Sequence, residues 1–128
     1  MILVVGGAFQ GKLKYAKEAF GLEDADFADG VSCGSDDVFE KKGINRLHEY
    51  VRRSLKEGRS IQGLAEELAR RNPDAVIICN ELGSGVVPAD AFEREWREAV
   101  GRLCCGIARE AEQVHRVVCG IGTVIKGG

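Results

Sequence analysis

The sequence predicts an α/β domain in which helices flank a mostly parallel β-sheet. Two apolar runs, residues 2–5 and 75–79, are continuous rather than alternating, as expected of strands buried on both faces of a parallel sheet. Helix-compatible stretches separate the strand-like ones, and this alternation is typical of parallel α/β sheets. A length of 128 residues, with 45% hydrophobic and 30% charged residues, predicts a single domain over residues 1–128.

In the N-terminal half, residues 1–6 predict the first strand, and residues 11–20 a helix that ends near Gly21. Residues 25–29 are a weak strand candidate before Gly30. From Ser35 the pattern becomes helical and continues to Gly58, while Ser60 opens a further helix over residues 60–71. The apolar residues of the first of these stretches recur at helical spacing: Ile44, Leu47, Val51 and Leu55.

In the C-terminal half, residues 75–79 predict a buried strand, followed by a glycine-bearing loop over 82–88. Asp90 is placed to cap a long helix over residues 90–112, with Glu93 three residues further on as in a capping box. Residues 114–119 predict another strand, and a glycine turn at 120–122 leads to a last short strand at 123–125. The apolar stripe of the long helix consists of Phe92, Trp96, Ala99, Leu103 and Ile107.

The first strand runs directly into Gly-x-x-x-x-Gly-Lys, a pattern that the following helix completes as a P-loop. In such a loop, backbone N–H groups surround phosphate oxygens, the helix N-terminus adds positive potential, and a lysine neutralises the outer phosphates. The sequence therefore predicts a P-loop NTPase-like fold. The alternative is an ordinary strand–helix turn in a chain with 17 glycines. The predicted nucleotide-binding residues are Gly6, Gly7, Ala8, Phe9, Gln10, Gly11, Lys12 and Leu13.

One position departs from the motif, because Leu13 stands where a serine or threonine would help to hold Mg²⁺. Gly6 and Gly11 are expected to supply positive φ angles and close backbone approach. Lys12 is the first candidate for a catalytic residue, because it would stabilise charge on the transferred phosphoryl group.

Two carboxylates follow predicted strands at the edge where such sheets bind ligands. Glu81 comes directly after the strand at 75–79 and is the better candidate for a Mg²⁺ ligand and catalytic residue; Asp29 is the second candidate for the metal. The alternative for each is a loop carboxylate that caps local N–H groups.

The two histidines receive different interpretations. His48 lies at the border of an apolar stripe and is a candidate nucleophile that would carry a nucleotidyl group, although a partly buried packing residue is the alternative. His115 is expected to be structural. The five cysteines show no Cys-x-x-Cys pair, and most are expected to be buried thiols of a cytoplasmic protein, with no zinc site.

Composition excludes several classes of partner. The net charge of −2 and the interspersed charges predict no nucleic-acid surface. No apolar run reaches the length of a membrane span, and the N-terminus lacks the basic region of a signal peptide. Small-molecule substrates, beginning with a nucleoside triphosphate, are the expected partners.

Two segments of the chain resemble the bifunctional adenosylcobinamide kinase/adenosylcobinamide-phosphate guanylyltransferase family of cobalamin biosynthesis. Residues 2–12 resemble the opening of that family, and residues 80–88, Asn-Glu-Leu-Gly-Ser-Gly-Val-Val-Pro, resemble its asparagine–glutamate loop ending in proline. The helix from Phe92 and the closing strands over 117–126 also resemble the family. The matching regions cover about 1–17 and 75–126.

The resemblance implies a trimeric, nucleotide-binding enzyme that uses ATP or GTP to phosphorylate adenosylcobinamide. It also implies transfer of GMP from GTP through a guanylylated histidine, with Mg²⁺ as cofactor. Two departures bear on this. Leu13 replaces the P-loop serine of the family, and the segment that carries the family's histidine looks deleted. In one alignment His48 is a faint match to that histidine; in the other, which the deletion favours, it lies on a later helix after the strand that ends at Asp29.

Three hypotheses follow from the sequence. The first is a shortened kinase or guanylyltransferase, and the second is a catalytically degenerate P-loop protein that binds nucleotide or corrinoid in a regulatory or assembly role. The third is a purely structural protein. No base-recognition pattern distinguishes GTP from ATP.

Overall fold

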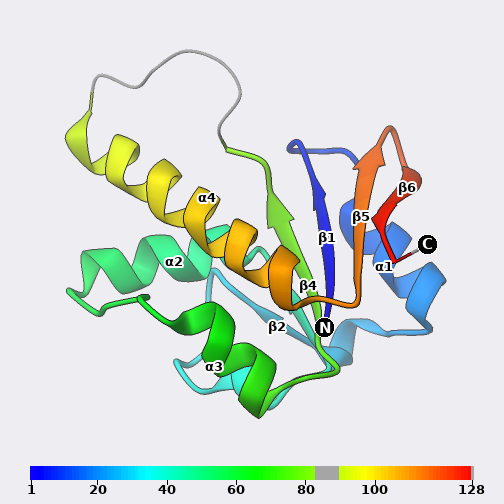
Figure 1. Ribbon diagram of the computed structural model, residues 1–128, viewed down its shortest axis with the longest axis horizontal. Helices are drawn as coiled ribbons and strands as arrows, with labels where there is room; N and C mark the ends of the chain where they lie inside the picture. The colour runs from blue at the N-terminus through cyan, green and yellow to red at the C-terminus, as the bar shows by residue number, and fades with distance from the viewer. Residues whose placement is uncertain (83–89, 128) are drawn as a thin grey trace.

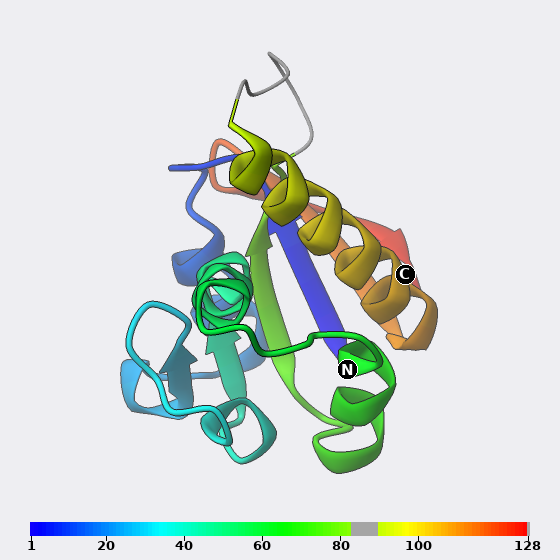
Figure 2. The same ribbon diagram turned by 90° about the vertical axis from the view of Figure 1, so that its left-hand side faces the viewer.

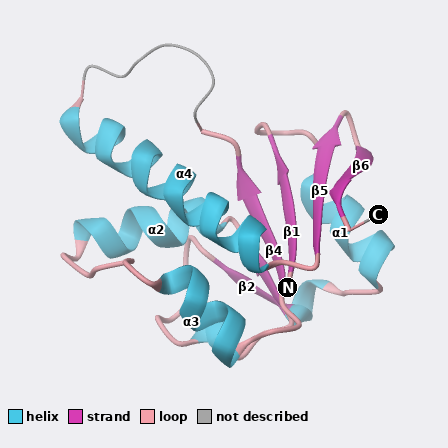
Figure 3. Ribbon diagram, viewed as in Figure 1, coloured by secondary structure: helices cyan, strands magenta, loops and turns pink. Residues whose placement is uncertain are grey.

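The computed structural model describes residues 1–82 and 90–127 and contains one six-stranded sheet between two layers of helices (Figure 1 and Figure 3). The strand order is β2-β3-β4-β1-β5-β6, and every pair is parallel except β5 with β6. The predicted α/β fold with a mostly parallel sheet is thereby confirmed. The glycine-bearing loop predicted at 82–88 lies, from residue 83 onward, outside the described residues.

The elements follow one another with short connections. In chain order they are β1 (Ile2–Gly6), α1 (Lys12–Phe20), a 3₁₀ turn (Asp24–Asp26), β2 (Phe27–Asp29), a second 3₁₀ turn (Asp37–Phe39), β3 (Gly43–Asn45), α2 (Leu47–Lys56), α3 (Leu64–Arg71), β4 (Val76–Asn80), α4 (Ala91–Glu110), β5 (Gln113–Val118) and β6 (Ile121–Lys126).

The two faces of the sheet bury separate apolar clusters. On one face, α2, α3 and α4 pack against alternate residues of the central strands, including Leu3 and Ile77. On the other face, α1 packs against Val4, Val76 and Ile78 (Figure 2). The central strands β1 and β4 are covered on both sides, which explains their continuous apolar sequences.

The register of the central strands brings several chain segments to one edge. Gly6, the last residue of β1, lies opposite Asn80, the last residue of β4. Parallel pairing of β1 with β5 places the end of β5 at the same edge. Ligands bind beyond the carboxyl ends of the strands in open α/β sheets, so this edge is the place to look for a site.

The sequence prediction was wrong over residues 35–46. Instead of one long helix, this stretch forms a 3₁₀ turn and the strand β3, and α2 begins only at Leu47. Ile44 is buried in β3 rather than on a helix face. The helix predicted from Ser60 begins at Leu64, because Ser60 accepts a hydrogen bond from the Gln62 N–H in a local turn.

Most other elements agree with prediction to within one or two residues. The Asp90 side chain caps α4 by accepting hydrogen bonds from the N–H groups of Phe92 and Glu93, although the Glu93 carboxylate pairs with Arg52. The expectation that most cysteines are buried was wrong, since only Cys33 and Cys79 are buried and the other three reach the surface to some degree. No helix in the described part of the chain combines the length and apolar character needed to cross a bilayer.

Candidate nucleotide-binding site

The loop between β1 and α1 has the backbone features that a phosphate cradle requires. Gly11 adopts φ 81° immediately before α1, a left-handed conformation that strains other residues. Gly6 serves a different purpose, because a Cβ there would lie 2.5 Å from the carbonyl oxygen of Val117. Within the described residues, the N–H groups of residues 7–9 and 11 donate no hydrogen bond to a protein acceptor, while a turn at Ala8 and Phe9 brings the Gln10 N–H toward the Gly7 carbonyl. The unpaired donors are therefore available to an anion at the N-terminus of α1.

Lys12 is the first residue of α1, and its side chain reaches back across this loop. Its side chain is largely buried, and its Nζ donates a hydrogen bond of 2.6 Å to the carbonyl oxygen of Gly7. Burial lowers the pKa of Lys12, while the nearby Cys79 and Glu81 act in the opposite direction. The ammonium group is thus held across the loop, in position to meet an incoming phosphate.

Gln10 fastens the loop to the far end of the sheet. Its carbonyl oxygen accepts a hydrogen bond of 2.8 Å from the Gly120 N–H, and its side-chain Oε1 accepts one of 2.6 Å from the Cys119 N–H. Both donors belong to the turn between β5 and β6. The sequence names Gln10 as a loop residue but contains no signal for this contact, because the partners are 109 residues apart.

The remaining loop residues do not contribute side chains to the interior of the loop. Phe9 is fully exposed in a left-handed conformation with φ 60°, and Ala8 is also exposed. Leu13 packs against the apolar cluster beneath α1. Its side chain has no oxygen to offer, so the loop lacks the metal ligand that a serine or threonine would provide.

Glu81 lies next to the loop, as the strand ends predicted. Its N–H donates to the carbonyl oxygen of Gly6 at 2.9 Å, which ties the end of β4 to the start of the loop. Its carboxylate, however, is held by Arg116 of β5 through two hydrogen bonds of 3.0 and 3.3 Å. Arg116 was not among the predicted site residues, although a charged residue near the end of a predicted strand was a usable signal.

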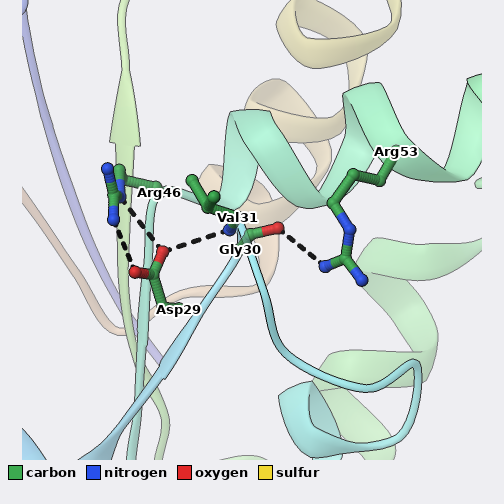
Figure 4. Close-up of polar contacts among 5 residues, drawn as sticks. All are labelled: Asp29, Gly30, Val31, Arg46 and Arg53. Atoms are coloured by element: carbon green, nitrogen blue, oxygen red, sulfur yellow. Dashed lines mark hydrogen bonds and ion pairs between the residues drawn. The ribbon is translucent and has the colours of Figure 1, made fainter.

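Asp29 takes up a separate position at the edge of the sheet. Two strands separate β2 from β1, which places Asp29 about 14 Å from the start of the loop at ordinary strand spacing. Its carboxylate accepts hydrogen bonds from the Arg46 side chain and from the Val31 N–H (Figure 4). Burial of the carboxyl opposes ionisation, but these hydrogen bonds lower the pKa of Asp29 overall. Arg53 holds the same turn from the other side by donating to the carbonyl oxygen of Gly30 at 2.9 Å.

In this arrangement the described side chains do not fit a protein-held Mg²⁺ site. Glu81 is paired with Arg116, Asp29 is paired with Arg46, and Leu13 is apolar. Within residues 1–82 and 90–127, there is no group of three or more potential metal-ligating side chains. We therefore derive no chemical step through Mg²⁺.

His48 also lies at the edge of the sheet near the loop. It lies in the first turn of α2, is only 4% exposed, and accepts a 3.1 Å hydrogen bond at Nδ1 from the Asn80 N–H. Trp96 of α4 donates from its indole Nε1 to the backbone carbonyl of His48 at 2.7 Å. Burial, together with the positive charges of Lys12 and Arg46, lowers the pKa of His48 to about 4. The imidazole is therefore neutral at pH 7.

The P-loop class of α/β proteins is defined by a strand that leads through a glycine-rich loop and a lysine into a helix. This chain has that arrangement in β1, residues 7–11, Lys12 and α1, within a mostly parallel sheet. The sequence model described as cobinamide kinase / cobinamide phosphate guanyltransferase matches residues 40–125. That match covers more than half of the chain, and the chain belongs to this family. The matched region contains His48, Glu81 and Arg116, whereas the Lys12 loop precedes it.

Individual relatives agree with this assignment. The chain is 38% identical over 66 residues to the bifunctional adenosylcobalamin biosynthesis protein CobU of Escherichia coli K12, and equally to that of Salmonella typhimurium LT2. Each match covers 52% of this chain and 36% of the relative. The matched segment thus spans little more than a third of the length of these relatives.

Proposed function

We propose that this chain binds a nucleoside triphosphate at residues 6–13 and acts in cobalamin biosynthesis. The proposed reactions are phosphorylation of adenosylcobinamide, transfer of GMP from GTP to adenosylcobinamide phosphate, or both. The observation that carries the proposal is the glycine-rich loop around Lys12, whose N–H groups at residues 7–9 and 11 have no acceptor among the described residues, in a chain of this family. The names of the relatives support a role in cobalamin biosynthesis, and the geometry of the loop supports binding of a nucleoside triphosphate.

In this proposal the N–H groups of residues 7–13 hold the phosphate oxygens, and Lys12 leaves the Gly7 carbonyl to bind the outer phosphates. Phosphoryl and nucleotidyl transfer depend mainly on positioning and charge stabilisation, so this loop provides the main catalytic contribution. Glu81 lies close enough to oppose the lowering of the Lys12 pKa by burial, and it is the carboxylate proposed to act beside Lys12. The cytoplasmic location and the homotrimer implied by the family resemblance belong to the same proposal.

The test is a calorimetric titration of the full chain with GTP and with ATP, each with and without Mg²⁺. Lys12→Ala is expected to abolish binding, because it removes the ammonium group that lies across the loop at the Gly7 carbonyl. Lys14→Ala is the matched control: it removes the same charge two residues away, from an exposed position on α1, and is expected to bind as the wild type does. If neither nucleotide binds the wild-type chain, the proposal is wrong.

A second candidate is a catalytically degenerate member of the family that binds nucleotide or corrinoid in a regulatory or assembly role. It is favoured by Leu13 and by the pairing of Glu81 with Arg116, since both reduce the metal ligands at the loop. This candidate predicts nucleotide affinity that hardly depends on Mg²⁺ and no turnover of adenosylcobinamide with GTP. If the wild type converts adenosylcobinamide with GTP and Lys12→Ala does not, the chain is an enzyme and the degenerate candidate is wrong.

A further inference from the structure

The two histidines of the chain are held in different ways, and the difference points to a role for His48. His115 uses both ring nitrogens within the protein: Nδ1 lies 2.7 Å from the Tyr15 hydroxyl, and Nε2 lies 2.7 Å from Oε1 of Gln113. His48 uses only Nδ1, toward the Asn80 N–H. Its Nε2 has no hydrogen-bond partner among the described residues and is not one of their buried unpaired atoms, so this nitrogen reaches the surface although the rest of the residue is buried.

The hydrogen bond from Asn80 fixes which nitrogen of His48 carries the proton. A backbone N–H can only donate, so Nδ1 must accept with its lone pair. The neutral ring then has its proton on Nε2. Because burial and the charges of Lys12 and Arg46 hold the pKa of His48 well below neutrality, this single tautomer is the working form at pH 7.

The ring is also placed beside the loop. Asn80 is the register partner of Gly6, so the group that holds His48 lies one strand spacing, about 4.8 Å, from the residue where the loop begins. Trp96 restricts the ring further, because its indole lies 6.4 Å away between centroids and its Nε1 binds the His48 carbonyl. The imidazole is held from two sides, as a preorganised donor requires.

We propose that His48 donates a hydrogen bond from Nε2 to a phosphoryl oxygen of the nucleotide bound at the Lys12 loop. This inference rests on the proposed nucleotide-binding function and gives His48 a different role from the nucleophile considered from sequence. A nucleophilic nitrogen needs a free lone pair. In His48 the lone pair of Nδ1 is engaged by Asn80, while Nε2 carries the proton.

Two substitutions of His48 test its Nε2 donor and its Nδ1 acceptor separately. In His48→Asn, the amide oxygen can replace Nδ1 as the acceptor for Asn80, but no donor remains at the position of Nε2. In His48→Gln, the amide nitrogen reaches the position of Nε2, but the acceptor for Asn80 is lost. With GTP and ATP as probes, His48→Asn is expected to bind roughly ten- to a hundredfold more weakly than wild type, and His48→Gln to retain more of the affinity.

A second measurement does not depend on either variant folding. Long-range ¹H–¹⁵N spectra of the wild-type chain report the tautomer of each histidine, with His115 as an internal reference. We expect His48 to carry its proton on Nε2, and the signal of this proton to shift on addition of the nucleotide while that of His115 does not. A proton on Nδ1 would overturn the inference.

The remaining outcomes distinguish the two proposals. If the wild type binds nucleotide and a folded His48→Asn binds equally well, the donor role is wrong and the proposed function stands. If GTP labelled at its α-phosphate leaves a covalent label that His48→Asn abolishes, His48 is a nucleophile and the donor role is wrong. If no nucleotide binds the wild type, the proposed function fails and the donor role fails with it.

Discussion

The pKa of His48 makes a quantitative prediction about stability. The folded-state pKa is about 4, whereas a histidine in the unfolded chain titrates near 6.5. As the pH falls below 6.5, His48 becomes protonated in the unfolded chain but stays neutral in the folded chain, so the free energy of unfolding falls. From these two values, lowering the pH from 7.5 to 5 should cost about 2 kcal/mol of stability through His48 alone.

The assay is urea denaturation at a series of pH values between 7.5 and 5, on the wild type and on His48→Asn. The difference between the two curves isolates His48, because His115, whose pKa burial also lowers, is present in both. Asp29 does not contribute in this window: its pKa is lowered from 3.8, so its stabilisation is lost only as the pH falls below that value. If the wild type and His48→Asn lose stability in parallel from pH 7.5 to 5, the assigned burial and neutral state of His48 are wrong.

Three further substitutions test packing at the loop, helix propensity in α4 and the ion pair beside the loop. Gly6→Ala should lower the free energy of unfolding by about 1–3 kcal/mol, because its Cβ would lie 2.5 Å from the backbone oxygen of Val117; a change within experimental error in urea denaturation would contradict this close approach. Gly101→Ala, in α4 with open space around the new Cβ, should instead raise stability by roughly 0.5–1 kcal/mol in the same assay. Arg116→Gln should release Glu81 and increase the effect of Mg²⁺ on nucleotide affinity roughly fivefold in calorimetry, and an unchanged effect would show that Glu81 does not meet the metal.

The order of elements around the loop was readable from sequence because each has a strong local signal. The apolar runs of β1 and β4, the glycine pattern between β1 and α1, and Asp90 at the start of α4 all act over a few residues. These signals were sufficient for the sheet class and for the loop.

The strand β3 was missed because its local signal is ambiguous. Ile44 stands at helical spacing from Leu47, yet it belongs to a strand whose side chains and those of α2 face the same core. Gly43 was the available clue: a Cβ there would collide with the ring of Phe27, its register partner in β2, so the glycine leaves room for that ring.

The site contacts that escaped prediction are long-range ones. Gln10 meets the β5–β6 turn across 109 residues, and Arg116 meets Glu81 across 35. Residue type alone shows that a side chain can form such bonds, but the sheet order decides which partner it reaches. The same limit explains Asp29, which has suitable chemistry at a strand end but stands on the edge strand β2 and is paired with Arg46, the residue before α2.

Two features count against a metal site at the loop, the pairing of Glu81 with Arg116 and the apolar side chain of Leu13. They differ in how easily a bound nucleotide can reverse them. Glu81 and Arg116 have side chains that are 32% and 55% exposed, so water screens their attraction and opening the pair costs on the order of 1 kcal/mol. A bound nucleotide could supply that free energy. Leu13 offers no such route, because no rotation of an aliphatic side chain produces an oxygen ligand. The lasting difference from a complete P-loop is therefore at Leu13, and a nucleotide bound there must hold Mg²⁺ mainly through its own phosphate oxygens and water.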